Sequence, residues 1–346
     1  MRLAIDLLHP AHVHFFKNLI AILLDRGDEV LLTARRKDIT IELLDQLSLP
    51  YETISTLGVG KAGLFLELIT RDLRLWRRVR RFKPDVLTGI SGVCAAHAAC
   101  LIRKPSVVWD DTEHQRHTHR LTYPFATQYQ SPSCYRHRLG PKQVLYDGYH
   151  ELAYLHPNRF TPDPNVLRQA GIDPDQRISV VRFVGWGAMH DQDLHGFTEP
   201  AKKQLINVLA AKSRVYITSE APLPAAFEPY RIALPAAKVH HLLAYADLFV
   251  GESATMASET VVLGAPAIYL DPVGRGYTDE QQYRYHMCWN FTHQQQDQVI
   301  AKAAELIAHD NLRQKVKDQW RQLLADKIDV TAYQLEVLER AAKAGR

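Results

Sequence analysis

Cysteine is scarce in this sequence, and the few cysteines are dispersed. Cys94, Cys100, Cys134 and Cys288 are spread over 346 residues without a CxxC pair among them. Disulfide-rich domains and zinc ribbons contain closely spaced pairs of cysteines. The spacing therefore argues against both classes, and we expect reduced thiols in a cytoplasmic protein.

Long apolar runs are also missing from the sequence. No stretch approaches the roughly 18 uninterrupted apolar residues of a membrane span, so any membrane contact is expected to be peripheral. Asp6 comes too early in the chain for the apolar region of a secretory signal. We find neither an internal repeat nor a low-complexity segment.

The composition is that of a folded globular protein. Hydrophobic residues make up 46% of the chain and charged residues 23%. A chain of 346 residues is long enough for two domains, each with its own core. The net charge of +4 suits a nucleotide ligand or an anionic membrane surface, and we expect no nucleic-acid partner.

Short apolar runs alternate with segments of helical periodicity, which predicts an α/β fold with two Rossmann-like domains. A segment at residues 160–174 with several prolines marks the expected boundary between domains at 1–160 and 161–330, followed by a helix at 331–346. Ligands of such folds bind at the carboxyl ends of parallel strands, here in a cleft between facing sheets. Expected strands are residues 2–8, 29–33, 85–90, 106–109, 178–184, 214–218 and 248–250.

The stretch at residues 251–270 has the order strand, loop, helix, strand and provides the main candidate binding site. Backbone N–H groups at the N-terminus of a helix attract anions, so we expect a diphosphate here. Glu259 lies about two helical turns further on, where its carboxylate can accept hydrogen bonds from ribose hydroxyls. The residues expected at the diphosphate are Ser253, Ala254, Thr255 and Met256.

Two strand ends in the first domain carry candidate acid–base groups. His12 follows the first strand, and a side chain with an ordinary pKa near neutrality makes it the first candidate general base. Asp111 and Glu113 follow the strand at residues 106–109 and are the next candidates, because crowded carboxylates push pKa values apart. The alternatives are structural: His12 bonds only to the backbone, and Asp110 and Asp111 cap the next helix.

A long helix is predicted at residues 64–82, with an apolar stripe beside a basic face. In one interpretation the helix packs on the sheet and its polar face is solvated. In the other, the basic face contacts anionic lipid head groups. The basic face consists of Arg71, Arg74, Arg78 and Arg81, and the apolar stripe of Leu64, Leu68, Leu75, Val79 and Phe82.

Residues 253–259, followed by an apolar stretch and Gly264-x-Pro266, resemble the donor-nucleotide motif of GT-B glycosyltransferases. The spacing is similar to that of the related non-hydrolysing UDP-N-acetylglucosamine 2-epimerases. From residue 9 to residue 331 the chain resembles a prokaryotic family of predicted GT-B enzymes. The resemblance therefore implies the GT-B architecture of two Rossmann-like domains.

Two further segments resemble the MurG-type N-acetylglucosaminyltransferases. Gln281 and Gln282 resemble the paired glutamines that hold the donor sugar in these enzymes. Residues 9–13 resemble their opening loop, with His12 at the histidine position, although the glycines of that loop are missing here.

The resemblance implies a metal-independent glycosyltransferase that needs no cofactor. It would move a sugar from a nucleotide sugar, with UDP favoured, to a polysaccharide or lipid-linked acceptor at the inner face of the plasma membrane. Alternatives are a nucleotide-sugar 2-epimerase and a catalytically inactive nucleotide-sugar-binding protein. Arg182 is a candidate for a phosphate or sugar acid, and His240 for the nucleotide base. Residues 191–193 match a metal-binding DxD, which we reject because they lie in a long loop.

Overall fold

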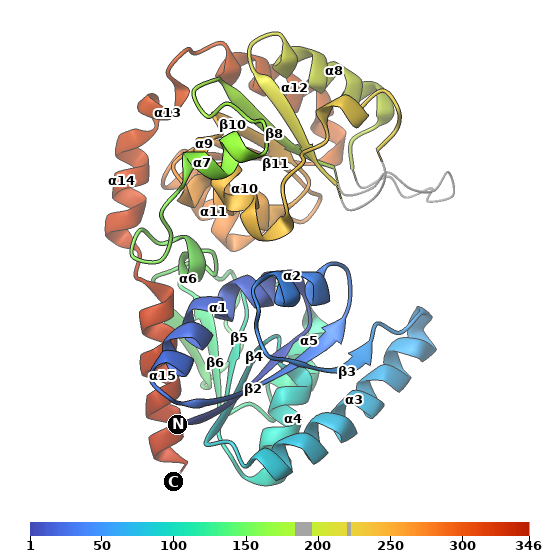
Figure 1. The fold of residues 1–346 in the computed structure, drawn as a ribbon, viewed down its shortest axis with the longest axis vertical. Coiled ribbons are helices and arrows are strands. Elements are labelled where there is room, and N and C mark those ends of the chain that lie inside the picture. Colours follow the sequence, from blue (N-terminus) through green and yellow to red (C-terminus); the bar gives the residue numbers. More distant parts are fainter. Residues whose placement is uncertain (184–195, 220–222, 346) are drawn as a thin grey trace. The chain divides into compact units, whose positions relative to one another are not determined.

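The computed structural model describes residues 1–183, 196–219 and 223–345, which form two compact units (Figure 1). Unit 1 comprises Met1–Arg159 and Ile328–Arg346, and unit 2 comprises Phe160–Lys327. Each unit contains one parallel β-sheet with helices on both faces. The predicted α/β fold with two parallel sheets is confirmed.

Unit 1 is built on seven parallel strands. They are β1 (Arg2–Leu7), β2 (Glu29–Arg36), β3 (Glu52–Thr56), β4 (Val86–Ile90), β5 (Ser106–Trp109), β6 (Gln128–Pro132) and β7 (Gln143–Tyr146). Their order in the sheet is β3-β2-β1-β4-β5-β6-β7. Because β1 pairs with both β2 and β4, the order reverses beside β1, and ligands of such sheets bind at this switch point.

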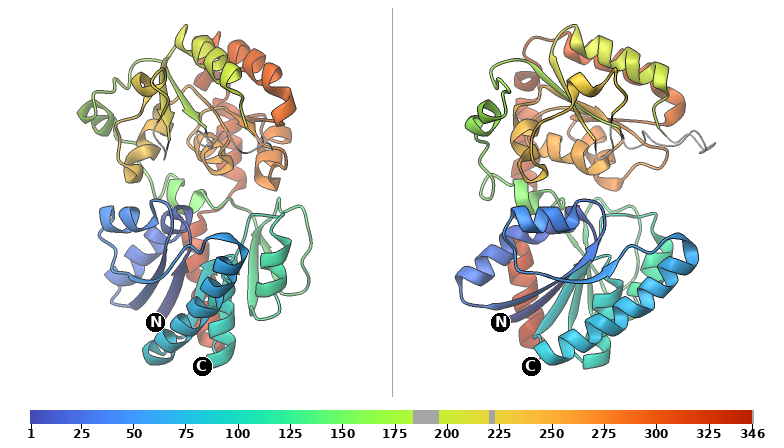
Figure 2. Two further views of the ribbon diagram at one scale, coloured as in Figure 1. Left: turned by 90° about the vertical axis from the view of Figure 1, so that its right-hand side faces the viewer. Right: turned by 45° about the vertical axis from the view of Figure 1, so that its right-hand side comes forward.

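Helices cover both faces of this sheet (Figure 2). One group in mutual contact comprises α1 (Pro10–Asp25), α2 (Thr40–Gln46), α6 (Leu152–Leu155) and α15 (Val330–Ala344). The other comprises α3 (Gly60–Phe82), α4 (Val93–Ile102) and α5 (Arg116–Thr122). Helix α1 begins with a proline after the N-cap His9, and Gly27 follows its end with a positive φ of 77°, as a helix stop requires.

The last helix, α15, belongs to unit 1. The Thr331 hydroxyl donates to the Ala153 carbonyl at 2.6 Å, and the Gln334 amide donates to the Phe15 carbonyl at 3.1 Å. Just before the helix, the Asp329 carboxylate binds the Arg159 guanidinium at 2.8 Å. The two points where the chain leaves and re-enters unit 1 are therefore held together by an ion pair.

Unit 2 is built on five parallel strands. They are β8 (Ile178–Arg182), β9 (Arg214–Thr218), β10 (Leu248–Gly251), β11 (Ala267–Leu270) and β12 (Cys288–Phe291), in the order β12-β11-β10-β8-β9. Helices α8 (Glu199–Ala210) and α12 (Gln296–Ile307) pack together over the main apolar core of the unit. The other helices are α7 (Pro164–Gln169), α9 (Val239–Tyr245), α10 (Ala254–Val262), α11 (Gly276–Tyr283), α13 (Leu312–Lys315) and α14 (Lys317–Asp326), with short 3₁₀ helices at Glu228–Tyr230, Ala236–Lys238 and His293–Gln295.

Helix α3 corrects two details of the sequence prediction. Arg71, predicted on the basic face, is only 2% exposed, and its guanidinium contacts Asp6 Oδ1 at 2.5 Å. It lies on the buried side because it is four residues from Leu75, which packs in the core. Leu64, predicted in the apolar stripe, is 44% exposed, because the core cluster reaches along α3 only from Leu68 to Phe82.

Candidate functional site

The loop between β10 and α10 presents a helix N-terminus at the carboxyl end of a central strand of unit 2. The Ser253 hydroxyl caps α10 by accepting the Met256 N–H at 3.3 Å. The N–H groups of Ala254 and Thr255 have no intrahelical acceptor, because they belong to the first turn. Residues 252–256 are half-buried. The predicted diphosphate residues are thus brought together at one helix start.

The backbone before this helix is fixed by close contacts. The Glu252 N–H donates to the Arg182 carbonyl at 3.0 Å, and the Glu252 carboxylate accepts the Phe197 N–H at 2.6 Å. A side chain at Gly251 would place its Cβ 2.6 Å from the Arg182 carbonyl oxygen. Arg182 itself ends β8 and is half-buried, beside the loop. Glycine is therefore required for the approach of β10 to β8.

Glu259 and His240, predicted to bind the ribose and the base separately, contact each other. His240 Nε2 donates to Glu259 Oε1 at 2.9 Å. Glu259 is 4% exposed and His240 is 1% exposed. Helix α9 packs against α10, which turns the His240 ring inward. The imidazole therefore orients the Glu259 carboxylate, and the contact predicted between His240 and a nucleotide base stays a prediction.

Gln281 and Gln282, predicted to hold a donor sugar, bond inside unit 2. Gln281 is fully buried, and its Nε2 donates to the Ser258 hydroxyl at 2.8 Å. Gln282 Oε1 accepts the Asn290 N–H at 2.6 Å. Gln281 therefore fastens α11 to α10, and a sugar contact through its side chain does not fit this position.

His12 lies at the carboxyl end of β1, in the first turn of α1. Its Nδ1 accepts the Leu8 N–H at 3.2 Å. Burial lowers the pKa of His12 well below its usual value, and the neighbouring His9, His150, Lys37 and Arg71 lower it further. The ring is therefore neutral with its proton on Nε2, because the Nδ1 lone pair is occupied. In this form His12 presents a hydrogen-bond donor at Nε2, which does not favour the predicted role of general base.

Asp111 is paired with a histidine that the sequence prediction missed. Its Oδ2 lies 3.2 Å from Nδ1 of His150. Since a carboxylate only accepts hydrogen bonds, Nδ1 carries the proton and the lone pair is on Nε2. Nε2 is buried and has no hydrogen-bond partner among the described residues. His150 follows β7 in the sequence. The centre of its ring lies 4.4 Å from the centre of the Phe15 ring in α1, the helix that follows β1.

The other two carboxylates at this strand end have structural partners. Asp110 is 1% exposed and accepts from His119 Nε2 and from the Tyr135 hydroxyl, both at 2.7 Å. Glu113 is 5% exposed and accepts the Arg136 N–H at 3.3 Å. Helix α5 begins six residues after Asp110, so the predicted capping role of Asp110 and Asp111 is wrong. Asp111 is the most accessible carboxylate of the three, with 15% of its side chain accessible.

Residues 191–193, compared with a DxD motif, lie outside the described residues. Within residues 1–183, 196–219 and 223–345, His, Cys, Asp and Glu side chains do not gather in groups of three suited to a metal ion.

The fold is shared with solved structures of glycosyltransferases and of UDP-GlcNAc 2-epimerases. UDP-GlcNAc 2-epimerase from Neisseria meningitidis, bound to UDP-GlcNAc, matches with a TM-score of 0.66 and 14% identity, over 98% of this chain and 100% of that chain. Spinosyn forosaminyltransferase SpnP matches with a TM-score of 0.66 and 13% identity, over 100% and 99%. The glycosyltransferase of kitacinnamycin matches with a TM-score of 0.63 and 12% identity, over 99% of both chains.

At this identity the likenesses show the fold alone, which confirms the predicted fold shared by GT-B glycosyltransferases and 2-epimerases. The narrower resemblance to MurG-type enzymes stays a prediction. A search of curated proteins finds no match to the sequence. The family model described as "Protein of unknown function (DUF354)" matches residues 1–331, and the chain belongs to this family.

Proposed function

We propose that the protein is a metal-independent GT-B glycosyltransferase that uses a nucleotide sugar as donor, with a UDP-sugar favoured. The observation that carries this proposal is the capped start of α10 with the Glu259 carboxylate in its second turn. It is supported by the fold, because a neighbour of this fold was solved with UDP-GlcNAc bound. The acceptor would be a polysaccharide or a lipid-linked sugar.

In this proposal unit 2 binds the donor. The N–H groups of Ala254 and Thr255 donate to the diphosphate, whose negative charge grows as the bond to the sugar breaks. The positive end of the α10 dipole adds to this stabilisation, so the leaving group needs no metal ion. Glu259, oriented by His240, accepts from the ribose hydroxyls.

Unit 1 provides the acceptor side. The acceptor hydroxyl gives its proton to the His150 ring, whose Nδ1–H is held by Asp111. The freed oxygen forms a bond to the anomeric carbon while the bond from that carbon to the diphosphate breaks, and the diphosphate leaves. Neutral His12 donates Nε2–H to an oxygen of the reacting groups. Protonation of His150 leaves an imidazolium that the Asp111 carboxylate stabilises.

A substitution at the start of α10 tests donor binding directly. Ala254→Pro removes one N–H, and proline is tolerated at the first helical position. Ser253 has φ −100° and ψ 111°, which is compatible with a following proline. Losing a hydrogen bond to a charged group costs about 1.5–3 kcal/mol, so affinity should fall roughly 10- to 100-fold. The matched control is Ala254→Ser, which keeps the N–H.

The assay is a thermal-shift titration with UDP-, GDP-, dTDP- and CMP-sugars, because bound ligand raises the melting temperature as ln(1 + [L]/Kd). A melting temperature that no nucleotide sugar raises would reject the proposed donor class. Equal affinities of the proline and serine variants for the nucleotide sugar would indicate that the donor does not bind at the start of α10. Transfer is then measured against acceptors, and binding without turnover across them would indicate a protein that only binds nucleotide sugars.

Epimerisation at C2 of a nucleotide sugar is the second candidate, because several structural neighbours are UDP-GlcNAc 2-epimerases. The donor site would be the same. Incubation with a nucleotide sugar and no acceptor separates the reactions, since only an epimerase changes the sugar under these conditions. Proton exchange with deuterated water at C2 would identify it.

A further inference from the structure

The outward side of helix α3 is apolar over its first half. Phe65 and Leu66 are 66% and 63% exposed, and Ile69 and Leu73 are 42% and 47% exposed. Leu66, Ile69 and Leu73 are spaced by three or four residues, so they lie on one side of the helix. Val59, the residue before the helix, is 93% exposed. Contiguous exposed apolar side chains of this kind mark an interaction surface.

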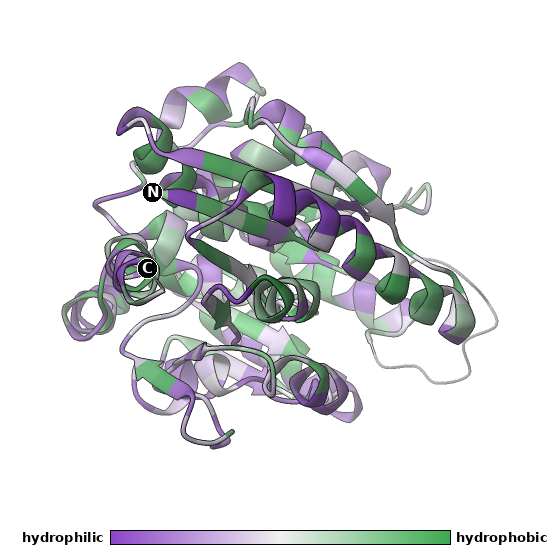
Figure 3. Ribbon diagram, turned by 90° about the horizontal axis from the view of Figure 1, so that it is seen from below, coloured by the Kyte–Doolittle hydropathy of each residue, from purple (hydrophilic) through white to green (hydrophobic). Residues whose placement is uncertain are grey.

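The same side of α3 becomes cationic in its second half, a change that Figure 3 shows as a shift in hydropathy along the helix. Arg77 and Arg80 continue the spacing of Leu66, Ile69 and Leu73, and both are exposed. We name the six residues from Phe65 to Arg80 on this side the α3 docking surface: Phe65, Leu66, Ile69, Leu73, Arg77 and Arg80.

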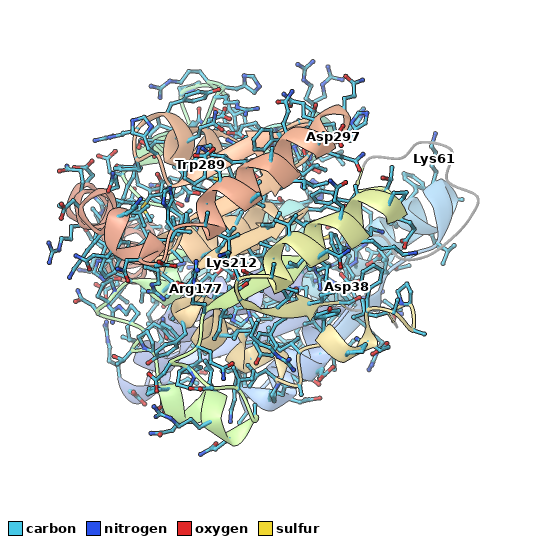
Figure 4. The ribbon with its side chains drawn as sticks, turned by 90° about the horizontal axis from the view of Figure 1, so that it is seen from above. Asp38, Lys61, Arg177, Lys212, Trp289 and Asp297 are labelled. Carbon is cyan, nitrogen blue, oxygen red and sulfur yellow. The ribbon has the colours of Figure 1, made fainter. Side chains whose placement is uncertain are left out.

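The acidic residues of α3 do not offset this charge. Glu67 is 7% exposed and accepts from Arg35 and Ser55 at 2.7 and 2.9 Å. Burial tends to raise the pKa of Glu67, but hydrogen bonds from Arg35, the Gly58 N–H and Ser55 outweigh it and lower the pKa. Asp72 binds His97 at 2.8 Å. At the helix start Lys61 is exposed and points outward (Figure 4).

A pocket of about 380 Å³ lies beside the cationic half of α3. Its apolar lining includes Trp76 and Leu101, and the Arg80 guanidinium lies 5.6 Å from the centre of the Trp76 ring. Three cationic side chains, Arg80, Lys83 and Lys104, also line it. A lining that combines apolar and cationic side chains suits an anionic head group attached to an acyl chain.

We propose that the α3 docking surface binds the surface of an anionic lipid bilayer. A helix of 23 residues is about 34 Å long, and lying flat it would place its apolar half among acyl chains and its arginines at the phosphates. Anionic lipids attract the arginines of this surface, whereas a second copy of the chain would bring its own arginines against them. The charge therefore favours a membrane over a second copy as the partner. In the described parts of the chain, no helix combines the length and apolarity needed to cross a bilayer.

This surface differs from the basic face predicted from the sequence. Arg71 is buried, Arg74 donates to the Ile54 carbonyl at 2.7 Å, and Arg78 binds Glu52 at 2.6 Å. Three of the four predicted arginines are thus bonded to unit 1 itself. The apolar start of α3 follows the carboxyl end of β3, the sheet edge that also carries His12. A membrane bound there would hold a lipid-linked acceptor near the acceptor-side residues.

Flotation of the full chain with vesicles tests the proposal. We expect binding to phosphatidylcholine vesicles that contain phosphatidylglycerol, weaker binding to phosphatidylcholine alone, and release by salt. Each arginine near an anionic surface contributes about a fivefold change in binding, so Arg77→Gln with Arg80→Gln should weaken it roughly 25-fold. The variant with Leu66→Ser, Ile69→Ser and Leu73→Ser should bind more than tenfold more weakly.

The matched controls are Leu24→Ser and Val144→Ser, which change side chains that are each 41% exposed on other elements of unit 1. They should leave vesicle binding unchanged. The far-ultraviolet circular dichroism and melting temperature of each variant check folding. Absence of binding by the unmodified chain, or equal binding by the triple-serine variant, would overturn the proposal. A concentration-dependent dimer that the triple-serine variant abolishes, without vesicle binding, would also overturn it and assign the surface to a second copy.

Discussion

The buried ion pair between Arg71 and Asp6 gives a sharp test of the packing of α3. Arg71 is 2% exposed, and besides Asp6 its guanidinium contacts the Ser55 hydroxyl at 2.5 Å. Asp6 is also 2% exposed, and its carboxylate accepts a hydrogen bond from the Thr33 hydroxyl at 2.6 Å. Arg71→Met leaves the carboxylate buried without its cation. Removing one partner of such a pair costs about 3–5 kcal/mol, and we expect that loss in the stability of unit 1.

The double variant Arg71→Met with Asp6→Leu should be more stable than Arg71→Met alone, because no uncompensated charge remains. Urea titration with hydrogen exchange of peptides from β1 and β4 measures the free energy of opening of unit 1 by itself. The control is Arg81→Met, an exposed site on the same helix, with an expected change within about 0.5 kcal/mol. A loss of less than about 1 kcal/mol in the free energy of opening for Arg71→Met would refute the reasoning. It would support the solvated position that the sequence predicts for Arg71.

Three other predictions follow from the two candidate sites. Because the pKa of His12 is lowered in the fold, the unfolded chain binds more protons below about pH 6.5, and stability falls there by up to about 1.4 kcal/mol per pH unit. His12→Gln should remove this contribution to the pH dependence of stability, measured by urea titration at pH 7.5 and 5.5. A difference in stability between variant and parent that is the same at both pH values would contradict the prediction. Gly251→Ala should cost about 1–3 kcal/mol and weaken nucleotide-sugar binding in the thermal-shift assay, since its Cβ meets the Arg182 carbonyl at 2.6 Å; unchanged melting and affinity would show that the strands can separate freely. His150→Gln should lower the rate of sugar transfer roughly 10²–10⁴-fold, and Asp111→Asn should shift the pH dependence of that rate. Both variants should keep the donor affinity of the parent. A loss of donor affinity in either variant would contradict the acid–base role of these residues.

Much of the fold could be predicted because its central strands are short, continuous apolar runs. The strands at 106–109 and 214–218 were predicted with the bounds that the structure has. Strand β3 was missed because only two of its five residues are buried, so Glu52–Thr56 lacks an apolar run. The helical periodicity of residues 312–325 predicts one helix, whereas in the structure α13 ends and α14 begins at Val316.

The candidate site was less predictable, because it depends on contacts between distant residues. A helix start after a strand is a local pattern, and the structure places Ser253 as its cap. The partner of Asp111 is His150, which is 39 residues later and one of 17 histidines, and no spacing marks it. A sequence also does not show in which direction a side chain points. Gln281 was predicted to face a sugar, and only the packing of α11 on α10 shows it turned inward.

The ion pair between Arg159 and Asp329 has a consequence for protein engineering. It joins the last residue before unit 2 to the second residue after it, and the Ile328 N–H fixes the returning chain to the Asp147 carbonyl at 2.8 Å. Unit 2 is therefore an insertion whose two ends meet at one point on the surface of its host. Deleting residues 160–327 and bridging the gap with a short glycine-rich linker should yield a miniature protein that keeps its final helix, in which ligands of unit 1 can be screened without unit 2.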